Sequence, residues 1–240
     1  MSAPLRVTVA QPVTAALDVT VNALEHARLV DESRARLVVF PELSITGYEL
    51  SADPIDPNDR RLDPITAACE RAGAVALVGA PVCEDGERFI AMLRVDGDGS
   101  EIVYRKQFVG GDEPSYFTSG RETGVLRLDG WRIGLGICKD TGSARHIAAM
   151  VRAGIDLYVA GVVHHSYERD EQEARALVIA RACGASVAFA SHAGPTGGGY
   201  TDPLGCSSIW TREGAAIASV DDQPGRLATA DLVADGGIAG

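Results

Sequence analysis

Four residues of types that take part in amide chemistry stand at or just beyond the ends of predicted strands. Cys138 closes the apolar segment "WRIGLGIC" and is followed at once by charged residues. Glu42 comes after the β-branched segment "RLVVFP", and Lys106 ends "EIVYRK". Glu113 lies in the polar loop beyond that lysine. Open α/β sheets gather their sites at strand ends, so the four could share a site, although spacing alone leaves this open.

Together these side chains would suit nucleophilic attack on a carbonyl carbon. A cysteine attacks as its thiolate and therefore needs a base or a cation beside it. Glu42 would accept the thiol proton, and Lys106 would stabilise the thiolate. Lys106 and the backbone N–H of Lys139 would meet the charge that develops on the carbonyl oxygen. Glu113 is expected to orient Lys106 or to bind the leaving nitrogen. A helix predicted over 142–154 would lower the thiol pKa further through its N-terminal field.

Each residue taken alone also has an ordinary structural explanation. A cysteine at a strand end is usually a packing residue, and a glutamate after a proline is usually a solvated turn residue. Lys106 alone would be read as a surface lysine, and Glu113 as part of a polar turn. Only their joint appearance favours chemistry.

Composition limits the function classes. The chain has 240 residues, enough for a substantial core, and no linker divides it, so we expect a single domain over 1–240. The net charge of −11 argues against nucleic acid or an anionic membrane as a partner. The N-terminal residues predict no signal peptide, and no apolar run approaches membrane-spanning length. Five cysteines without a Cys-x-x-Cys pair indicate free thiols and a cytoplasmic location, and no metal or organic cofactor is expected.

Helical and strand-like segments alternate at both ends of the chain, while the middle is rich in strands and tight turns. This mixture predicts an α/β fold with mixed sheets rather than a purely parallel one. The predicted helices cover 15–35, 65–73, 142–154 and 168–184, and the predicted strands cover 5–11, 36–43, 74–82, 89–95, 101–106, 124–128, 131–137, 157–163, 186–191, 206–210, 215–220 and 226–232.

Three segments in register carry a resemblance to a known family. "VVFPELSITGY", "YRK" followed by "EPSYFTSG", and "IGLGICKD" resemble the signature blocks of the nitrilase superfamily, the carbon–nitrogen hydrolases. "VTVAQ" near the start and "GCSSIWTREG" near the end also fit that pattern, so the similarity covers nearly the whole chain. The resemblance implies a four-layer α-β-β-α sandwich and assembly into a homodimer or a higher homo-oligomer.

The resemblance also implies a role for each residue. Cys138 would be the nucleophile, Glu42 the general base, Lys106 the cation that stabilises the oxyanion, and Glu113 the second glutamate of the site. The implied reaction is hydrolysis of a small amide or an N-carbamoyl compound through a cysteine thioester, which releases ammonia or an amine. Nitrilases of the family place Trp-Glu after the cysteine, whereas this chain has Lys139 and an aspartate, so the amidase-like branch is favoured.

The expected substrate pocket involves four further residues, each with two interpretations. Lys139 would attract a substrate carboxylate or simply face solvent. Tyr48 and Tyr116 would form an aromatic wall or serve as packing residues, and Tyr116 is favoured for the wall because it lies in the loop after Lys106. One of His164 and His165 would contact the substrate, or both would be buried histidines bonded to the backbone.

Arg175 and the glycine-rich loop lie outside these motifs. Arg175 is interpreted as structural, and the glycine-rich loop 194–200 as a segment near the site or a subunit contact. No ligand spacing supports a zinc site at the two histidines.

Three alternatives to an amidase-like hydrolase follow from the sequence. A Cys-His-Glu glutaminase would need a Gly-x-Cys-x-Gly turn and a late His-x-Glu pair, and the chain has neither. An acyltransferase that uses the same Glu-Lys-Cys set with an amine acceptor would present the same motifs. An inactive relative that only binds ligand is disfavoured, because Glu42, Lys106 and Cys138 are all intact.

Overall fold

Two six-stranded mixed sheets form the centre of the protein in a computed structural model that describes residues 3–234. One sheet has the order β12-β1-β2-β3-β4-β5 and the other β11-β10-β9-β8-β7-β6. The strands are β1 (Leu5–Gln11), β2 (Leu37–Val39), β3 (Val75–Glu84), β4 (Glu87–Asp96), β5 (Gly99–Arg105), β6 (Val125–Leu128), β7 (Trp131–Ile137), β8 (Leu157–Val162), β9 (Ser186–Ser191), β10 (Ser208–Trp210), β11 (Ala216–Ser219) and β12 (Arg226–Leu232).

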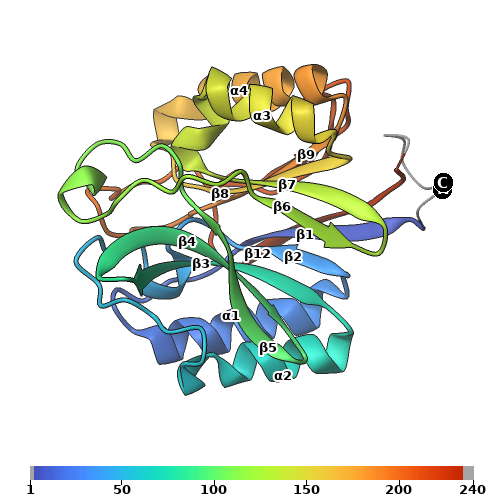
Figure 1. Cartoon of the computed structure of the whole chain (residues 1–240). Helices are drawn as coiled ribbons and strands as arrows, with labels where there is room; N and C mark the ends of the chain where they lie inside the picture. The colour runs from blue at the N-terminus through green and yellow to red at the C-terminus, as the bar shows by residue number, and fades with distance from the viewer. Residues whose placement is uncertain (1–2, 235–240) are drawn as a thin grey trace.

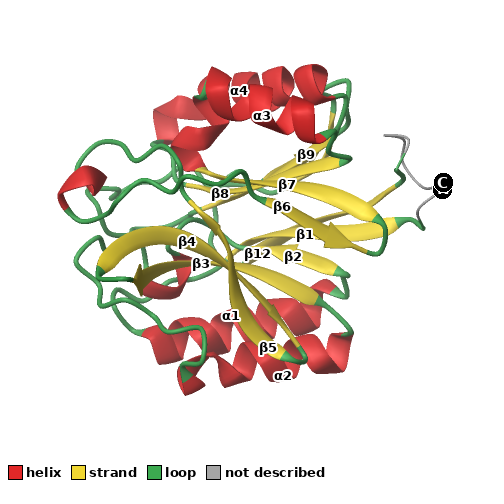
Figure 2. Cartoon of the chain, viewed as in Figure 1, coloured by secondary structure: helices red, strands yellow, loops and turns green. Residues whose placement is uncertain are grey.

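Helices cover the outer face of each sheet, so the fold has four layers. Figure 1 shows α1 and α2 on the sheet that contains β1–β5, and α3 and α4 on the sheet that contains β6–β9. The same layers are visible by secondary structure in Figure 2. The predicted four-layer α-β-β-α sandwich with mixed sheets is therefore confirmed. The helices are α1 (Val19–Ser33), α2 (Asp63–Ala72), α3 (Ala144–Ala153) and α4 (Arg169–Cys183).

Three apolar cores hold these layers together. The largest lies between the sheets and includes Val9, Leu77, Leu135 and Val159. One further core joins α1 and α2 to their sheet, and another joins α3 and α4 to theirs. The inner strands β2, β8 and β9 are buried at every position, which explains why they read as continuous apolar runs rather than alternating ones.

Local signals set the helix ends. Asp18 accepts a hydrogen bond from the backbone N–H of Val21 and caps α1, so this helix begins four residues later than its apolar pattern predicts. Gly73, Gly154 and Gly184 adopt the left-handed conformation just after α2, α3 and α4, as the predicted helix ends require.

The segment between β5 and β6 crosses from one sheet to the other. β4 and β5 form the hairpin that the turn "DGDGS" predicts, but β6 pairs with β7 in the opposite sheet. The crossing segment carries Lys106 and Glu113 over the edge of the sandwich. The parallel strands β7 and β8 end at this same edge. The strand β5 runs in the same direction as β2, so these two strands end at that edge as well.

The single-domain prediction over 1–240 also reaches residues 1–2 and 235–240, which lie outside the described residues. No helix between residues 3 and 234 is both long and apolar enough to cross a membrane.

Candidate active site

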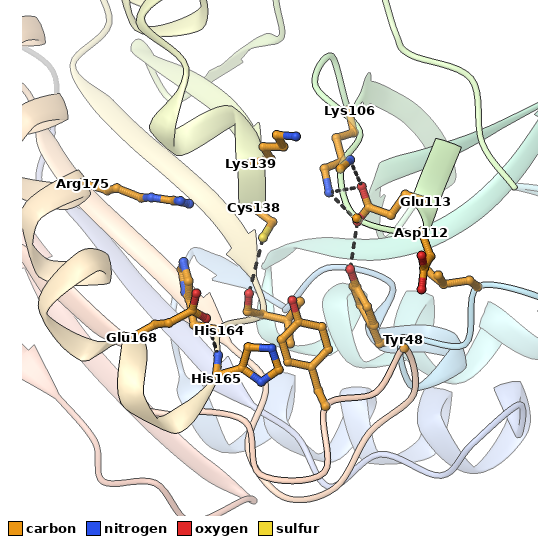
Figure 3. A pocket seen from close by; sticks show the side chains of 16 residues that line it. Tyr48, Lys106, Asp112, Glu113, Cys138, Lys139, His164, His165, Glu168 and Arg175 are labelled. Atoms are coloured by element: carbon orange, nitrogen blue, oxygen red, sulfur yellow. Dashed lines mark hydrogen bonds and ion pairs between the residues drawn. The ribbon is translucent and has the colours of Figure 1, made fainter. Parts of the chain in front are cut away.

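A cavity of about 380 Å³ opens at the edge where these strands end. Cys138 and Lys106 both line it, together with Glu113 (Figure 3). The other lining residues are Tyr48, Leu50, Gly110, Gly111, Asp112, Lys139, Val163, His164, His165, Glu168, Arg175, Gly198 and Tyr200.

Three buried ionisable side chains form a cluster at the cavity, where Lys106 and Glu113 line the wall and Glu42 contacts Lys106 without lining it. The Lys106 Nζ atom lies 2.6 Å from Glu42 Oε1 and 2.7 and 2.8 Å from the two carboxylate oxygens of Glu113. The three side chains are at most 5% exposed. Glu113 also accepts hydrogen bonds from the Tyr48 hydroxyl and the Gly110 N–H, each at 2.8 Å. Both Glu113 oxygens are thus engaged, whereas Glu42 Oε2 has no partner among the described residues.

Burial and charge shift the pKa values of Glu42 and Lys106. Burial raises the pKa of Glu42 to about 8, and the charge of Glu113 adds to this, while Lys106 opposes it. Burial disfavours the charge of Lys106, but the carboxylates of Glu42 and Glu113 and the neighbouring Cys138 outweigh that effect and raise its pKa. Lys106 therefore stays a cation, and Glu42 is the group that exchanges a proton near neutral pH.

Two glycines fix the backbone around Glu42. A side chain at Gly161 of β8 would lie 2.7 Å from both the Glu42 nitrogen and the Phe40 oxygen. Gly79 of β3, which belongs to the other sheet from β8, lies against the same segment. His192 adds a hydrogen bond of 2.7 Å from Nε2 to the Glu42 carbonyl oxygen. Both sheets thus set the position of the carboxylate.

Gly161→Ala is expected to lower the free energy of unfolding by about 1–3 kcal/mol, because its methyl group would overlap backbone atoms of both Phe40 and Glu42. Chemical denaturation measures this loss. Gly97→Ala is the control, since its nearest neighbour is Glu70 at 3.3 Å and it lies in a surface turn. Equal losses in the two variants would contradict this explanation of the close approach at Gly161.

Cys138 follows β7 in a strained conformation. Its φ of 40° lies in the left-handed region, which non-glycine residues adopt only where the surroundings require it. The buried carboxylate of Asp140 supplies that support, because it accepts hydrogen bonds from the Ile137 and Phe108 N–H groups and from the Tyr104 hydroxyl. Asp140 thereby ties the turn at the cysteine to the segment that follows Lys106.

The pKa of the resting Cys138 thiol is higher than the sequence predicts. Burial, with the carboxylate of Glu42, raises the pKa of the Cys138 thiol to about 12, although Lys106 acts in the opposite direction. The expected lowering by the helix after the cysteine is wrong, because residues Cys138–Gly142 form a short 3-10 helix and α3 begins only at Ala144. The thiol is half-buried, and its Sγ lies 3.4 Å from the Val163 oxygen.

The family of the chain follows from a comparison with known protein families. The model of the carbon–nitrogen hydrolase family matches residues 6–237. The chain is a carbon–nitrogen hydrolase. The family resemblance that the three sequence blocks indicated is therefore confirmed.

Relatives of this hydrolase include both short and long proteins. A hydrolase encoded in the pqqF 5′ region of Pseudomonas protegens is 28% identical over 84% of this chain and 74% of its own length. A glutamine-dependent NAD(+) synthetase of Xanthomonas campestris is 32% identical over 77% of this chain, but the match covers only 36% of the synthetase. Among solved structures, a mutant of the amidase from Nesterenkonia sp. AN1 has a TM-score of 0.80 at 23% identity, with 96% of this chain and 91% of the amidase covered.

The predicted pocket residues of the hydrolase divide into two groups. Tyr48, Lys139 and His164 line the cavity, as does His165. Tyr116 does not line it and is 41% exposed. The reason is local, because Tyr116 follows the short 3-10 helix Glu113–Ser115, which turns Glu113 inward and leaves the tyrosine at the surface.

Several cavity residues of the hydrolase were missed or misread in the sequence. Arg175, interpreted as structural, reaches the cavity from α4 and binds Glu171 and the Thr141 hydroxyl. Tyr200, in the glycine-rich loop, stacks on His165 at 4.3 Å between ring centroids and lines the cavity. The loop itself therefore lies at the site. No sequence signal marked Glu168 or Asp112, which are ordinary surface acids by type. Within residues 3–234, no group of three or more His, Cys, Asp or Glu side chains could hold a metal ion.

Proposed function

We propose that this hydrolase cleaves the C–N bond of a small amide through a thioester on Cys138. The observation that carries the proposal is the buried bridge of Lys106 between Glu42 and Glu113, at 2.6–2.8 Å, in the same cavity as a half-buried thiol. A buried cation held by two carboxylates is costly to assemble for stability alone, which favours a functional explanation.

The first half of the proposed reaction forms the thioester. Ionised Glu42 accepts the thiol proton, for which its unpartnered Oε2 is suited. The Cys138 sulfur attacks the amide carbon, and the negative charge on oxygen is met by the Lys106 ammonium and by the backbone N–H of Lys139. Protonated Glu42 then gives its proton to the leaving nitrogen, and ammonia departs.

The second half releases the acid. Water enters, Glu42 accepts its proton, and the resulting attack on the thioester returns the free thiol and a carboxylic acid. Glu113 acts as a positioning residue, since both its oxygens hold the Lys106 ammonium in place and are themselves held by Tyr48 and Gly110. Lys106 therefore needs no reorganisation during the reaction.

The relatives support this class of substrate. A mutant of the Nesterenkonia amidase shows covalent addition of the acetamide moiety of fluoroacetamide at its active-site cysteine. Further structures of that amidase hold acrylamide or butyramide. We therefore propose a short aliphatic amide as the scaffold of the substrate. An N-carbamoyl compound, the other substrate class expected from the sequence, is the alternative that an amide panel would reveal.

Ammonia release from a panel of short amides and N-carbamoyl compounds tests the proposal. We expect hydrolysis of at least one short primary amide, and complete loss after iodoacetamide has modified Cys138. Alkylation must be mapped by peptide mass spectrometry, because Cys83 is exposed and will also react. Full activity in protein alkylated at Cys138 would overturn the proposal.

The pH profile is expected to follow Glu42. Its pKa is raised to about 8, and the free enzyme needs the carboxylate as base, so kcat/KM should rise with pH and level off above about pH 8. The rate constant rises rather than falls with pH because protonated Glu42, which cannot act as a base, predominates below that pKa. A kcat/KM series on one amide measures it. A profile that stays flat between about pH 6 and about pH 9 would contradict this role of Glu42.

Cytoplasmic location and homo-oligomerisation stay predictions from the sequence and the family. Fractionation of cells and light scattering of the purified protein would test them.

A further inference from the structure

The glycine-rich loop 194–200 brings to the cavity a polar group that the proposed reaction does not use. Tyr200, at the end of this loop, is half-buried and lines the cavity together with Cys138. Its hydroxyl forms no hydrogen bond with any residue between 3 and 234. Polar groups withdrawn from solvent usually have a partner, so this hydroxyl is suited to bind a ligand in the cavity.

The backbone of the loop is held against Tyr48. The Gly197 N–H donates to the Gly47 carbonyl oxygen at 2.9 Å, and the Tyr200 N–H donates to the Gly197 carbonyl oxygen at 3.2 Å. A Cβ atom at Gly198 would lie 2.6 Å from Cε1 of the Tyr48 ring, so the loop approaches that ring as closely as only glycine permits. The position of Tyr200 is therefore set by the tyrosine whose hydroxyl binds Glu113.

Contacts between aromatic rings fix the direction of the Tyr200 side chain. Its ring stacks on His165, with centroids 4.3 Å apart and an interplanar angle of 22°. It also meets the Tyr48 ring edge-on at 5.4 Å between centroids. Tyr167 stacks on His165 as well, at 5.1 Å. Aromatic pairs at these separations are stabilising, so they hold the Tyr200 ring in place while its hydroxyl keeps its capacity to bind a ligand.

The Tyr200 hydroxyl lies close to the reacting groups. Burial raises the pKa of Tyr200, and among the charged groups Cys138 adds most to this rise, followed by Glu42. Because the interaction between charges weakens with distance, the hydroxyl lies on the side of the cavity that holds the thiol and its base. The raised pKa also keeps the hydroxyl neutral, so it can accept and donate hydrogen bonds without exchanging a proton.

The proposed reaction leaves one polar atom of the substrate for this hydroxyl. The carbonyl oxygen is met by the Lys106 ammonium and the Lys139 N–H, and the acyl chain of a short aliphatic amide is apolar. The remaining polar atom on the reacting carbon is the leaving nitrogen. Its N–H groups need an acceptor inside the cavity, and both oxygens of Glu113 are already engaged.

Resting on the proposed function, we propose that the Tyr200 hydroxyl oxygen accepts a hydrogen bond from the leaving nitrogen of a primary amide. This contact turns the nitrogen lone pair of the tetrahedral intermediate toward Glu42. The proton that the nitrogen gains still comes from Glu42. The C–N bond breaks, its electron pair leaves with the nitrogen, and ammonia departs, while Tyr200 keeps its own proton.

Tyr200→Phe tests this contact, because it keeps the ring and removes only the hydroxyl. We expect kcat/KM for a hydrolysed primary amide to fall by about tenfold. Tyr167→Phe is the matched control, since it removes a hydroxyl from the same ring stack, but Tyr167 is 80% exposed and does not line the cavity. The control should stay within about twofold of the unaltered protein.

Equal kcat/KM for Tyr200→Phe and the unaltered protein would overturn the inference and leave the proposed function in place. Failure of the unaltered protein to hydrolyse any amide would overturn both.

Ligand binding without turnover distinguishes the contact from a change in cavity shape. In Cys138→Ala, dissociation constants are measured by NMR titration for butyramide and for pentan-2-one, which has a methyl group in place of the amide NH2. Adding Tyr200→Phe should weaken butyramide binding by about tenfold and leave pentan-2-one within about twofold. An equal change for the two ligands would show that Tyr200 only shapes the cavity, and would overturn the inference.

Discussion

Cys138→Ala is expected to abolish amide hydrolysis, with a loss in kcat of at least about a thousandfold, while the fold is retained. The reason is that no other thiol lines the cavity among the described residues, so no second group can form the thioester. Initial rates of ammonia release measure the loss, and circular dichroism measures the fold.

Cys183→Ala is the matched control for this loss. Cys183 is also half-buried, but it ends α4 and does not line the cavity. Its removal should leave kcat within about twofold. Residual activity of Cys138→Ala within about tenfold of the unaltered protein would show that another residue performs the attack.

Lys106→Met should have the largest effect on stability. Without the ammonium, the buried carboxylate of Glu113 loses its counter-ion and Glu42 is held in its neutral form, and removing one partner of such a buried ionic group costs about 3–5 kcal/mol. Amide hydrolysis should be lost as well, because the oxyanion loses its cation. Urea denaturation at neutral pH measures the free energy of unfolding.

The pH dependence of this loss identifies its cause. The pKa of Glu42 is raised above its ordinary value in the folded protein, so its ionisation costs stability as pH rises through that pKa. Removal of Lys106 increases this cost, and the loss should therefore shrink near about pH 4, where carboxyl groups are protonated. Lys139→Met, at an exposed lysine, should change stability by less than about 0.5 kcal/mol at either pH. A loss for Lys106→Met that is equal at both pH values would contradict the electrostatic explanation.

The sequence placed Glu42, Lys106, Glu113 and Cys138 at strand ends, whereas the four-layer sandwich and a site shared by the four residues were implied by the family resemblance. Each of the four lies at or just beyond a strand that ends at one edge of the sandwich, and strand direction is visible in the alternation of helices and strands. The order of the three signature blocks in the chain supplied the expectation that the four residues share one site. Their catalytic roles stay a proposal.

Features that depend on distant packing were beyond the sequence. The thiol pKa depends on burial at Cys138, and the neighbouring helix was too weak a guide to it. The sequence favoured Tyr116 over Tyr48 as a pocket residue, which is wrong. The short 3-10 helix Glu113–Ser115 leaves Tyr116 exposed, whereas packing buries Tyr48 at the cavity. Arg175 reaches the cavity only because α4 packs beside residues 138–142, a contact between segments far apart in the chain.

Intact-mass and peptide mass spectrometry of a rapidly quenched turnover mixture tests the thioester most directly. With an amide that the protein hydrolyses as substrate, we expect the peptide that contains Cys138 to gain the mass of that amide minus ammonia, which is the mass added by its acyl group. The adduct should be removed by hydroxylamine and absent from Cys138→Ala. Turnover without any acyl adduct under conditions that make deacylation slow, or an acyl group on a different residue, would contradict the account.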